Sequence, residues 1–531
     1  MKRFQIKNLR SIKDSGVIDI GGVNFFVGAN GTGKSSILRF FPLVKQTVSQ
    51  KNSSPLLWYA KDGVDLGSFN ESVNKLDSEK GITFVLEFEE TITVSSKLVS
   101  NIIINSYLEK YQKNTTRESF LENWMWFYQN VSEILVQKIE VTILDTIFMK
   151  LKIFFNDTTV EFDIQENKII SHNTEFEIEN IITKKEEYPL LPRLFVELDS
   201  KTSRMEKYFA HKIIDLMMKE ASPRIKWKTW VNIFEKLNYS KQKENILQGL
   251  RIQKLPKTVT NKFLDSDSQL SNELYSYISI ILACKLLYES NQLISEYFKN
   301  ITYIAPIRAT AERYYRVQGL SVEEVDPMGI NVPMILDYMR SNNSEQSWQD
   351  WTMSNFNIKY RANTNGGNTS IEVYIDGEYY NLADTGFGYS QFLPILLMLW
   401  QEESSTDEYK QNAEINFFAN ANRKKYTPRK TVVIEQPELH LHPKMQSQFA
   451  ELLFNLVTRQ DNKVDFIIET HSITIINKIG ELIEQKNLGA DTSLAEKLFN
   501  LYLVNAHSDK KIVKTQYDKD GVIKEWPIGF L

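Results

Sequence analysis

The sequence predicts an α/β fold with a mixed sheet, to which an antiparallel β subdomain and a helical insertion are added. The apolar run at 23–27 is followed at once by glycines and then by a helical pattern, which is typical of a buried parallel strand that feeds a βα turn. Two further apolar runs, 431–435 and 465–469, also lead into helical patterns. Segments such as 82–88 and 151–155 instead favour antiparallel strands.

Composition limits the class of protein. Hydrophobic residues make up 42% of the 531 residues, so the chain can bury a core and is not a disordered tail. Lys and Arg number 63 against 67 Asp and Glu, and this net charge of −4 does not identify a nucleic-acid binder. The one cysteine, Cys284, excludes an intrachain disulfide and a Cys-based zinc site.

Targeting segments are not expected. The N-terminus lacks the apolar run of a signal peptide. The longest apolar stretch, 392–400, is far shorter than the ~20 residues that span a bilayer. We therefore expect a cytoplasmic protein without a membrane segment.

The patterns divide the chain into four predicted parts. Residues 1–90 form an N-terminal lobe, and 91–200 form a mainly antiparallel β subdomain with a helical piece near 108–131. Residues 201–300 form a helical insertion, and 301–531 form a C-terminal lobe. The first and last parts together supply the parallel strands of the predicted sheet.

The glycine-rich stretch after the first apolar run carries the clearest chemistry. It has the form G-x-x-x-x-G-K-S between a predicted strand and a predicted helix, the context that identifies a phosphate-binding loop, or Walker A motif. Glycines let backbone N–H groups turn toward phosphates, Lys34 reaches the β- and γ-phosphates, and the Ser35 hydroxyl can ligate Mg²⁺. The predicted ATP-binding residues are Gly28, Asn30, Gly31, Thr32, Gly33, Lys34, Ser35 and Ser36.

Two later strands also end in polar residues. The run 431–435 ends in Glu435, and a carboxylate in this place is what a P-loop ATPase needs to hold Mg²⁺. We therefore expect Ser35 and Glu435 to form the magnesium site. The second run ends in Glu469-Thr470-His471-Ser472, and because ligands bind at the carboxyl edge of such sheets, His471 is predicted to sense the γ-phosphate.

A second glycine turn, at 384–391, lies directly before the apolar helix 392–400. Small residues with a serine at a helix N-terminus can bind an anion. A glycine turn with a capping serine has the same appearance, so this signal alone stays open.

Together these motifs resemble the ABC-type ATPase heads of the SMC/RecF/OLD class. The resemblance rests on the Walker A motif, the glycine turn in the place of the ABC signature, and the Walker B strand 431–435 running into Gln436-Pro437-Glu438-Leu439-His440-Leu441-His442-Pro443. The Thr470-His471-Ser472 loop completes it, and order and spacing match over nearly the whole chain. The stretches 303–308, 312–315 and 520–530 are similar to the bacterial Septu (PtuA) type ATPases of phage defence and retron systems.

The resemblance implies an ABC-type P-loop ATPase head that uses ATP and Mg²⁺ as a head-to-tail homodimer. The signature of one protomer would face the ATP held by the Walker motifs of the other. Four residues would supply that trans contact: Gly386, Gly388, Ser390 and Gln391.

One position departs from the ABC-type pattern. These heads usually carry a Glu directly after the Walker B acid, where this sequence has Gln436, which cannot accept a proton as a carboxylate does. A Gln can still orient water, and Glu438 is a nearby candidate base. We therefore expect slow turnover and a switch rather than a motor, with Glu435, Gln436, Glu438 and His471 as the catalytic set.

A basic segment runs from Lys219 to Lys262 and holds 11 basic and 3 acidic residues, although the whole chain has a net charge of −4. Aromatic residues are interleaved with them, and such a pattern can hold phosphates and stack bases. An amphipathic arm with a solvated Lys face is the alternative. The candidate contacts to nucleic acid or to a partner are Arg224, Lys226, Lys228, Lys241 and Lys243.

Two smaller features of the sequence concern partner docking and metal binding. The polar segment 401–430 has no periodicity and predicts a loop that could dock a partner. His440 and His442 lie two residues apart near Glu438, but no fourth metal ligand is nearby in the sequence.

Three functions stay open at this point. The first is an ATPase subunit of an anti-phage complex that controls a separately encoded nuclease, such as an HNH protein, with retron RNA or DNA or phage DNA as further partners. The expectation of a separate nuclease rests on the short stretch after His471, which leaves no room for the Toprim domain of OLD-type proteins. The second is a RecF/SMC-like ATPase that binds DNA in repair. The third is an ATP-binding assembly scaffold with negligible catalysis.

Overall fold

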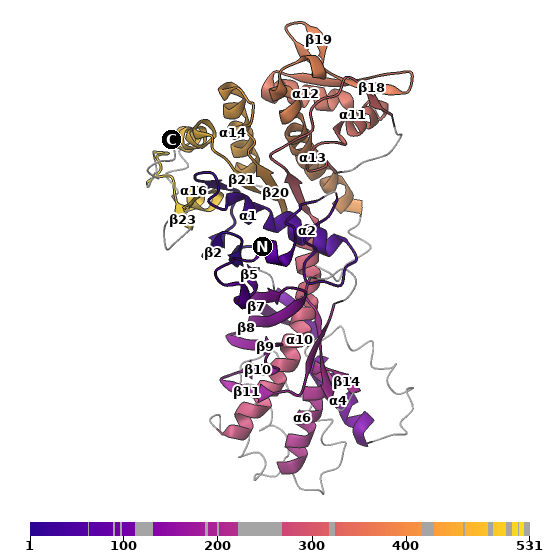
Figure 1. Cartoon of the computed structure of the whole chain (residues 1–531), viewed down its shortest axis with the longest axis vertical. Helices are drawn as coiled ribbons and strands as arrows, with labels where there is room; N and C mark the ends of the chain where they lie inside the picture. Colours follow the sequence, from indigo (N-terminus) through magenta and orange to yellow (C-terminus); the bar gives the residue numbers. More distant parts are fainter. Residues whose placement is uncertain are drawn as a thin grey trace. The chain divides into compact units, whose positions relative to one another are not determined.

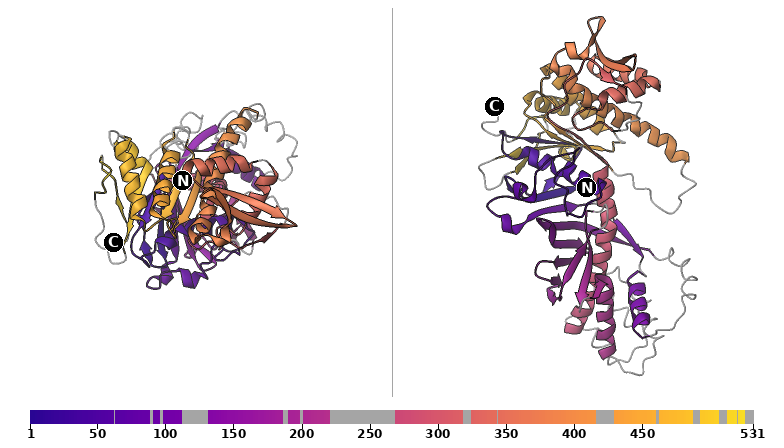
Figure 2. Two further views of the ribbon diagram at one scale, coloured as in Figure 1. Left: turned by 90° about the horizontal axis from the view of Figure 1, so that it is seen from above. Right: turned by 45° about the vertical axis from the view of Figure 1, so that its right-hand side comes forward.

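The computed structural model describes most of the 531 residues. The described ranges are 1–61, 63–88, 91–95, 98–111, 131–185, 190–198, 201–220, 268–317, 324–342, 344–415, 429–459, 462–486, 492–505, 512–518 and 520–524. They fall into two compact units (Figures 1 and 2). Unit 1 comprises residues 1–8, 47–57 and 73–295, and unit 2 comprises 9–46, 58–72 and 296–531.

Unit 2 is built on a six-stranded sheet that brings together strands far apart in sequence. In sheet order these are β15 (Ile301–Ile304), β20 (Lys430–Glu435), β21 (Val464–Glu469), β4 (Val23–Val27), β22 (Phe499–Val504) and β23 (Ile512–Thr515). The first five run parallel, and β23 is antiparallel to β22. Their near-continuous apolar sequences fit strands that are buried on both faces.

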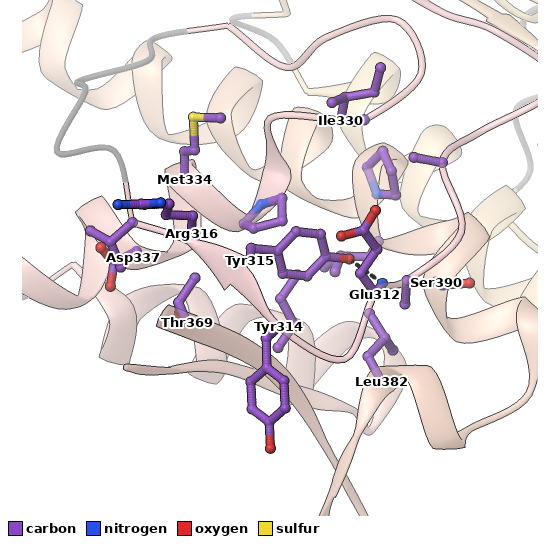
Figure 3. A pocket seen from close by; sticks show the side chains of 18 of the residues that line it. Glu312, Tyr314, Tyr315, Arg316, Ile330, Met334, Asp337, Thr369, Leu382 and Ser390 are labelled. Atoms are coloured by element: carbon purple, nitrogen blue, oxygen red, sulfur yellow. Dashed lines mark hydrogen bonds between the residues drawn. The ribbon is translucent and has the colours of Figure 1, made fainter. Parts of the chain in front are cut away.

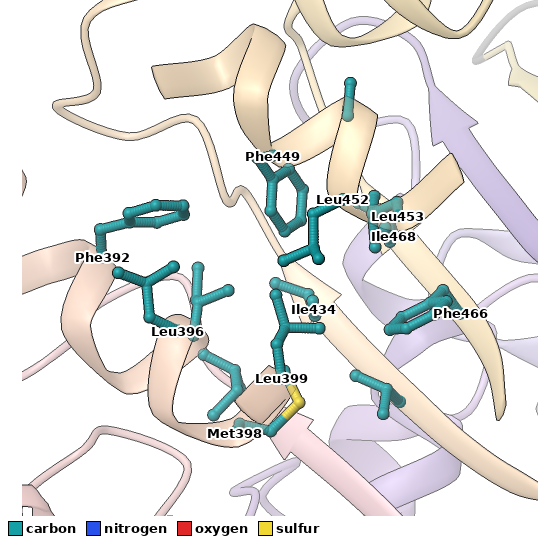
Figure 4. Packing of buried hydrophobic residues seen from close by; sticks show 14 of the residues in the cluster. Phe392, Leu396, Met398, Leu399, Ile434, Phe449, Leu452, Leu453, Phe466 and Ile468 are labelled. Carbon is teal, nitrogen blue, oxygen red and sulfur yellow. The ribbon is translucent and has the colours of Figure 1, made fainter. Parts of the chain in front are cut away.

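Helices pack their apolar residues against this sheet. Phe392, Leu396 and Leu399 of α13 (Phe387–Ile415) belong to one buried cluster with residues of β20, β21 and α14 (Pro443–Thr458), as Figure 4 shows. Each fully buried Leu or Phe side chain contributes roughly 1.5–3 kcal/mol to the free energy of unfolding. The cluster therefore fixes where the end of β20 and the start of α13 lie within unit 2.

Unit 2 also holds a small antiparallel sheet and several short elements. The small sheet is formed by β16 (Tyr315–Arg316), β17 (Lys359–Asn365), β18 (Asn368–Ile375) and β19 (Glu378–Asn381). The other elements of this unit are β2 (Ile12–Asp14), β3 (Ile18–Asp19), α1 (Lys34–Leu38), α3 (Phe69–Ser72), α11 (Val332–Ser341), α12 (Glu345–Phe356), a 3-10 turn at Leu382–Asp384, α15 (Ile473–Gln485) and α16 (Thr492–Leu498).

Unit 1 is dominated by antiparallel strands. The main path runs in the order β11 (Thr174–Glu177), β10 (Lys168–Ser171), β9 (Thr158–Asp163), β8 (Ile147–Phe155), β7 (Val131–Leu144), β5 (Ile82–Glu87) and β1 (Arg3–Leu9), with β6 (Thr91–Ser95) on β7. A three-stranded sheet holds β12 (Ile181–Lys184), β13 (Arg193–Leu198) and β14 (Lys201–Arg204). The remaining elements of the chain are α2 (Phe40–Ser49), a 3-10 turn at Ser78–Lys80, α4 (Leu98–Tyr111), α6 (Met205–Glu220) and α10 (Gln269–Lys299).

The predicted fold class is confirmed: the chain is α/β, with a mixed sheet, an antiparallel β subdomain and helices in the insertion. The predicted boundaries differ in detail. Strands β1 and β5 lie in the predicted lobe 1–90 but pair with each other, and β5 pairs with β7 of the antiparallel sheet. Local patterns could not show this, because strand pairing is set by residues distant in sequence.

Two local predictions need correction. The helical piece expected near 108–131 begins earlier, at Leu98, and residues 112–130 lie outside the described part of the chain. The loop expected from residue 401 is helical as far as Ile415, because α13 continues through a stretch without Gly or Pro. Among the described residues, no helix is both long and apolar enough to span a membrane.

Candidate functional site

The Walker A loop connects β4 to α1 in unit 2, and its glycines are required by its backbone. The backbone φ values of Gly28, Gly31 and Gly33 are 149°, 77° and 108°, which residues other than glycine rarely adopt. A Cβ atom on Gly28 would lie 2.3 Å from the Val504 carbonyl oxygen. The predicted loop is therefore formed at the carboxyl end of β4.

Lys34 is folded into this loop. Its side chain is 3% exposed, and Nζ donates hydrogen bonds to the carbonyl oxygens of Gly28 (3.0 Å) and Ala29 (2.9 Å). Nζ also lies 3.7 Å from Oε1 of Glu469. Burial lowers the pKa of Lys34, while Glu469 acts in the opposite direction. Phosphate oxygens can replace these acceptors around the ammonium group.

Ser35 pairs with a carboxylate that the sequence analysis did not select. Its Oγ donates a 2.7 Å hydrogen bond to Oε2 of Glu469, the last residue of β21. Glu469 is 2% exposed, and burial raises the pKa of its carboxyl group although Ser35 and Lys34 favour the charged form. A signal for Glu469 was present, because the run 465–469 also ends in an acid, and β21 lies directly beside β4.

Glu435, the predicted partner of Ser35 at the magnesium site, makes other contacts. Arg39 donates to both of its carboxylate oxygens at 2.9 and 3.1 Å, and the Tyr303 hydroxyl donates at 2.6 Å. Burial opposes the charge on Arg39, but the hydrogen bonds with Glu435 raise the pKa of its guanidinium. The structure therefore joins Ser35 to Glu469 and Glu435 to Arg39, not Ser35 to Glu435.

The residues after Glu435 form a tight turn. Gln436 has a φ of 47° and donates its backbone N–H to the Glu469 carbonyl oxygen at 2.8 Å. Glu438 accepts from the Thr470 hydroxyl at 2.8 Å and from the His471 backbone N–H at 2.7 Å. Glu438 therefore positions the loop that carries His471, and its role as a base stays a prediction.

His471 follows β21 and lies near the Walker A lysine. Burial and the charge of Lys34 lower its pKa, so the imidazole is neutral near pH 7. Its Nε2 atom is buried and has no hydrogen-bond partner among the described residues. Ser472 caps α15 by accepting from the Ile475 backbone N–H at 3.0 Å, which fixes the end of this loop. His471 therefore has an unused ring nitrogen at the carboxyl edge of the sheet.

The predicted signature segment is only partly exposed. No atom lies within 4 Å of a Cβ placed on Gly386, and Phe387 is 61% exposed. Gly388 packs closely on the backbone of His440, whose carbonyl oxygen would lie 2.5 Å from a Cβ at this position. Ser390 is 7% exposed and donates to the Phe387 carbonyl oxygen at 3.0 Å.

The side chain of Gln391 is also buried within its own protomer. It is 6% exposed, and its amide donates to the carbonyl oxygen of Arg308 at 3.1 Å. The side chains of Ser390 and Gln391 therefore point into their own protomer, and the trans role predicted for them stays a prediction. Both side chains form hydrogen bonds within the first turns of α13 or with Arg308, and this leaves Gly386 as the exposed member of the predicted set.

Arg308 connects the end of β20 to the start of α13. It is 3% exposed and donates to the carbonyl oxygens of Glu435 (2.8 Å), Gln436 (3.3 Å) and Gln391 (3.4 Å). Burial lowers its pKa to about 10. In the sequence, Arg308 is only part of a resemblance, because a lone arginine after a strand gives no sign of its acceptors.

A separate pocket lies beside the signature segment in unit 2 (Figure 3). Its volume is about 620 Å³, and its lining includes Tyr315, Ile330, Asp337 and Ser390 but no residue of the Walker A loop. The Tyr315 hydroxyl accepts from the Glu312 backbone N–H at 2.7 Å on one wall. The pocket is thus distinct from the site at the sheet edge.

The remaining predicted residues divide into two groups. Arg224, Lys226, Lys228, Lys241 and Lys243 lie outside the described residues. His442 is the N-cap of α14, where its Nδ1 accepts from the Lys444 backbone N–H at 3.2 Å. Within the described ranges, no cluster of three or more His, Cys, Asp or Glu residues could hold a metal ion by itself.

Comparison with known families decides the class of the chain. The model of the AAA ATPase domain family matches residues 1–476. The chain belongs to this family. As an AAA ATPase domain it carries the Walker A loop, the strand-end carboxylates and His471 within the matched residues. No curated protein matches this ATPase domain.

Among solved structures, this AAA ATPase domain is similar to SMC heads. A structure of the SMC head bound to the C-terminal winged-helix domain of ScpA is 10% identical, with a TM-score of 0.33 and 98% of each chain covered. The Pyrococcus furiosus SMC head with an extended coiled coil, bound to the C-terminal domain of ScpA, is 11% identical, with a TM-score of 0.32 and coverages of 97% and 96%. The Thermotoga maritima SMC head is 12% identical, with a TM-score of 0.30 and coverages of 97% and 98%.

Proposed function

We propose that this chain is an SMC-like, ABC-type ATPase subunit of an anti-phage defence complex, in which ATP-dependent closure of a homodimer controls a separately encoded nuclease. One observation carries the ATP part of the proposal. Adjacent strands β4 and β21 place Lys34, Ser35 and Glu469 within hydrogen-bond or ion-pair distance at one sheet edge. The membership in an ATPase domain family agrees with this chemistry.

The site fits ATP with Mg²⁺. Glycine-supported backbone N–H groups and Lys34 suit the phosphates, and the Ser35 hydroxyl beside a carboxylate supplies the oxygen ligands that Mg²⁺ prefers. Bound Mg²⁺ would neutralise charge on the phosphates during hydrolysis. Lys34 and the loop hold the nucleotide, and His471 presents a neutral imidazole toward the same edge.

The start of α13 supports a homodimer. Gly386 and Phe387 are exposed, and Phe387 lies beside His440, with 6.0 Å between ring centroids. A second protomer can therefore approach the backbone of Gly386 closely. This is what the ABC-type resemblance requires of a signature that acts on the ATP of a partner.

Slow turnover follows from the residues after Glu435. Gln436 cannot take a proton from water, and Glu438 accepts two hydrogen bonds from the His471 loop. Gln436 is thus no general base, and Glu438 is held in place by the His471 loop. An ATP-bound dimer that persists between hydrolysis events suits a switch that holds a nuclease in one state.

The defence role rests on the resemblance to Septu and retron-associated ATPases. The nuclease, such as an HNH protein, and retron RNA or DNA or phage DNA are its proposed partners. The basic segment of 219–262 is the proposed contact for nucleic acid, and most of it lies outside the described residues. A RecF/SMC-like ATPase that binds DNA by itself is the alternative that the experiments must separate.

The first experiment tests the ATP-dependent dimer. Nucleotide binding and molecular mass in solution are measured with and without ATP and Mg²⁺ for the wild type, Lys34→Ala and the matched control Lys463→Ala, whose side chain is exposed. We expect wild type and control to bind ATP and double in mass, whereas Lys34→Ala loses at least about tenfold in affinity and stays monomeric. A wild type that binds no ATP would overturn the proposal.

The second experiment identifies partners. The tagged protein and its Lys34→Ala variant are recovered from the native host, and bound proteins and nucleic acids are identified. A nuclease that copurifies in stoichiometric amount supports the defence complex. Chromosomal DNA alone, lost with Lys34→Ala, supports the RecF-like alternative.

A further inference from the structure

The ends of β20 and β21 offer two carboxylates for one magnesium site. Glu435 and Glu469 are paired in register on these neighbouring parallel strands. Sequence alone favours Glu435, as the acid that ends the predicted Walker B strand. The contacts of the two side chains favour the other residue.

Glu469 already contacts both side chains of the Walker A motif that would work with the ion. Its Oε2 accepts from Ser35 Oγ at 2.7 Å, and its Oε1 lies 3.7 Å from Lys34 Nζ. Lys34 and Ser35 begin α1, directly after the Walker A loop that follows β4, and Glu469 ends β21, the strand beside β4. The three side chains therefore meet without rearrangement of the sheet. A serine hydroxyl and a carboxylate held this close form the start of an oxygen ligand set.

The side chain of Glu435 is bound by other residues of the chain. Arg39 binds both of its oxygens, and Tyr303 donates a third hydrogen bond to Oε1. Glu435 is 1% exposed, and a metal ion that displaced Arg39 from it would break a largely buried ion pair. Its charge is already balanced by Arg39.

The charges of Glu469 and Lys34 also favour Glu469 as the metal ligand. The side chains of Glu469 and Lys34 are each 3% exposed. When Lys34 turns to nucleotide phosphates, a buried carboxylate is left without its cation, which is unfavourable unless another cation takes its place. A divalent ion beside Ser35 would supply that charge.

We infer that Glu469, rather than Glu435, is the carboxylate that holds Mg²⁺ together with Ser35, and that Glu435 is a structural partner of Arg39. This inference rests on the proposed ATPase function. It assigns a ligand that the Walker B pattern does not identify. It also explains why β21, the strand beside β4, ends in an acid.

The test measures the metal directly. Mn²⁺ affinity is determined by electron paramagnetic resonance on the full chain with bound ADP, for the wild type, Glu469→Gln, Glu435→Gln and the control Glu451→Gln, which replaces an exposed acid of α14. ADP affinity in EDTA is measured in parallel. We expect Glu469→Gln to weaken Mn²⁺ binding about tenfold or more while metal-free ADP affinity changes less than about twofold.

The other variants decide between the two acids. Glu435→Gln and Glu451→Gln should leave Mn²⁺ affinity within about twofold of wild type. Unchanged Mn²⁺ affinity in Glu469→Gln, or an equal loss in Glu435→Gln, overturns the inference. Glu469→Asp retains the charge and is expected to fall between wild type and Glu469→Gln, which covers the case of a Gln variant that folds poorly. A wild type that binds ADP in neither condition would instead refute the proposed function itself.

Discussion

Strands β20 and β21 have similar sequences, yet the glutamates at their carboxyl ends contact different side chains. Both are buried apolar strands that end in glutamate, and the two glutamates are register partners. Glu469 meets Ser35 and Lys34, whereas Glu435 meets Arg39 and Tyr303. Sheet order explains the difference, because β21 lies beside β4 and its Walker A loop, while β20 lies beside β15, which brings Tyr303.

The loops after the two strands are tied together. Glu438, beyond β20, accepts hydrogen bonds from Thr470 and His471, beyond β21. Gln436 donates its N–H to the carbonyl oxygen of Glu469. A change at one strand end can therefore reach the other through these hydrogen bonds.

The largest effect on stability is expected at Glu435. Glu435→Gln removes the partner of Arg39 in a largely buried ion pair, and we expect the free energy of unfolding to fall by about 2–3 kcal/mol. This value is below the usual range because the Arg39 side chain is 29% exposed and regains some hydration. Urea denaturation provides the measurement.

Glu469→Gln is the comparison for this prediction. It should lower the unfolding free energy by less than Glu435→Gln, because Lys34 keeps its carbonyl acceptors in the Walker A loop. An Arg39→Gln/Glu435→Gln double variant should lose little more than Glu435→Gln alone. Equal losses of unfolding free energy in Glu469→Gln and Glu435→Gln would contradict the conclusion that Glu435 is the structural carboxylate of the two.

Arg308→Met extends the comparison from the end of β20 to α13. The substitution leaves the carbonyl oxygens of Glu435, Gln436 and Gln391 without a donor, and we expect a loss of about 2 kcal/mol in unfolding free energy. Arg308→Lys should recover part of it, since an ammonium group reaches fewer of these acceptors. Thermal unfolding of both variants is the measurement, and a Lys variant less stable than Met would contradict the account.

Much of this site could be predicted from local sequence. The Walker A loop follows from glycine spacing, because Gly28, Gly31 and Gly33 adopt backbone angles that the motif itself demands. The end of β21 and the capping role of Ser472 are equally local. These features depend on residues that are neighbours in the chain.

The partners of Glu435 and Glu469 could not be predicted in this way. They depend on how the strands are ordered in the sheet, because Ser35 and Glu469 are 434 positions apart and Arg39 and Glu435 are 396 positions apart. The orientation of Gln391 likewise depends on Arg308, from a different strand end. The unexpected length of α13 has a simpler cause: a polar, charged stretch can be a solvated helix as readily as a loop.

Gln436→Glu asks whether the end of β20 is where water is activated. If Gln436 limits turnover, a carboxylate in its place should raise the ATP hydrolysis rate about tenfold, less than the 10²–10⁴-fold that a well-positioned general base contributes. Single-turnover hydrolysis of bound ATP measures the chemical step. Glu438→Gln serves as the control and should not raise the rate, because Glu438 positions His471. An unaltered rate in Gln436→Glu would count against this place for the base.

The smallest effect is expected at the opposite edge of the sheet, where a buried carboxylate should influence stability alone. Glu402 is 5% exposed and contacts Lys430, at the start of β20, at 2.6 Å. Burial raises the pKa of Glu402 although Lys430 favours its charge. Between its ordinary pKa, near 4.5, and the raised value, the folded chain holds this proton more tightly than the unfolded chain, so its contribution to stability falls as pH rises.

Glu402→Gln removes this contribution. Relative to wild type, the variant should therefore gain unfolding free energy as pH rises above about 4.5, which urea denaturation at several pH values can follow. ATP affinity should be unchanged, because Glu402 lies at the amino end of the strands, away from Lys34 and Ser35. If Glu402→Gln weakens ATP binding, the two edges of the sheet are coupled, and the assignment of the chemistry to the carboxyl edge alone fails.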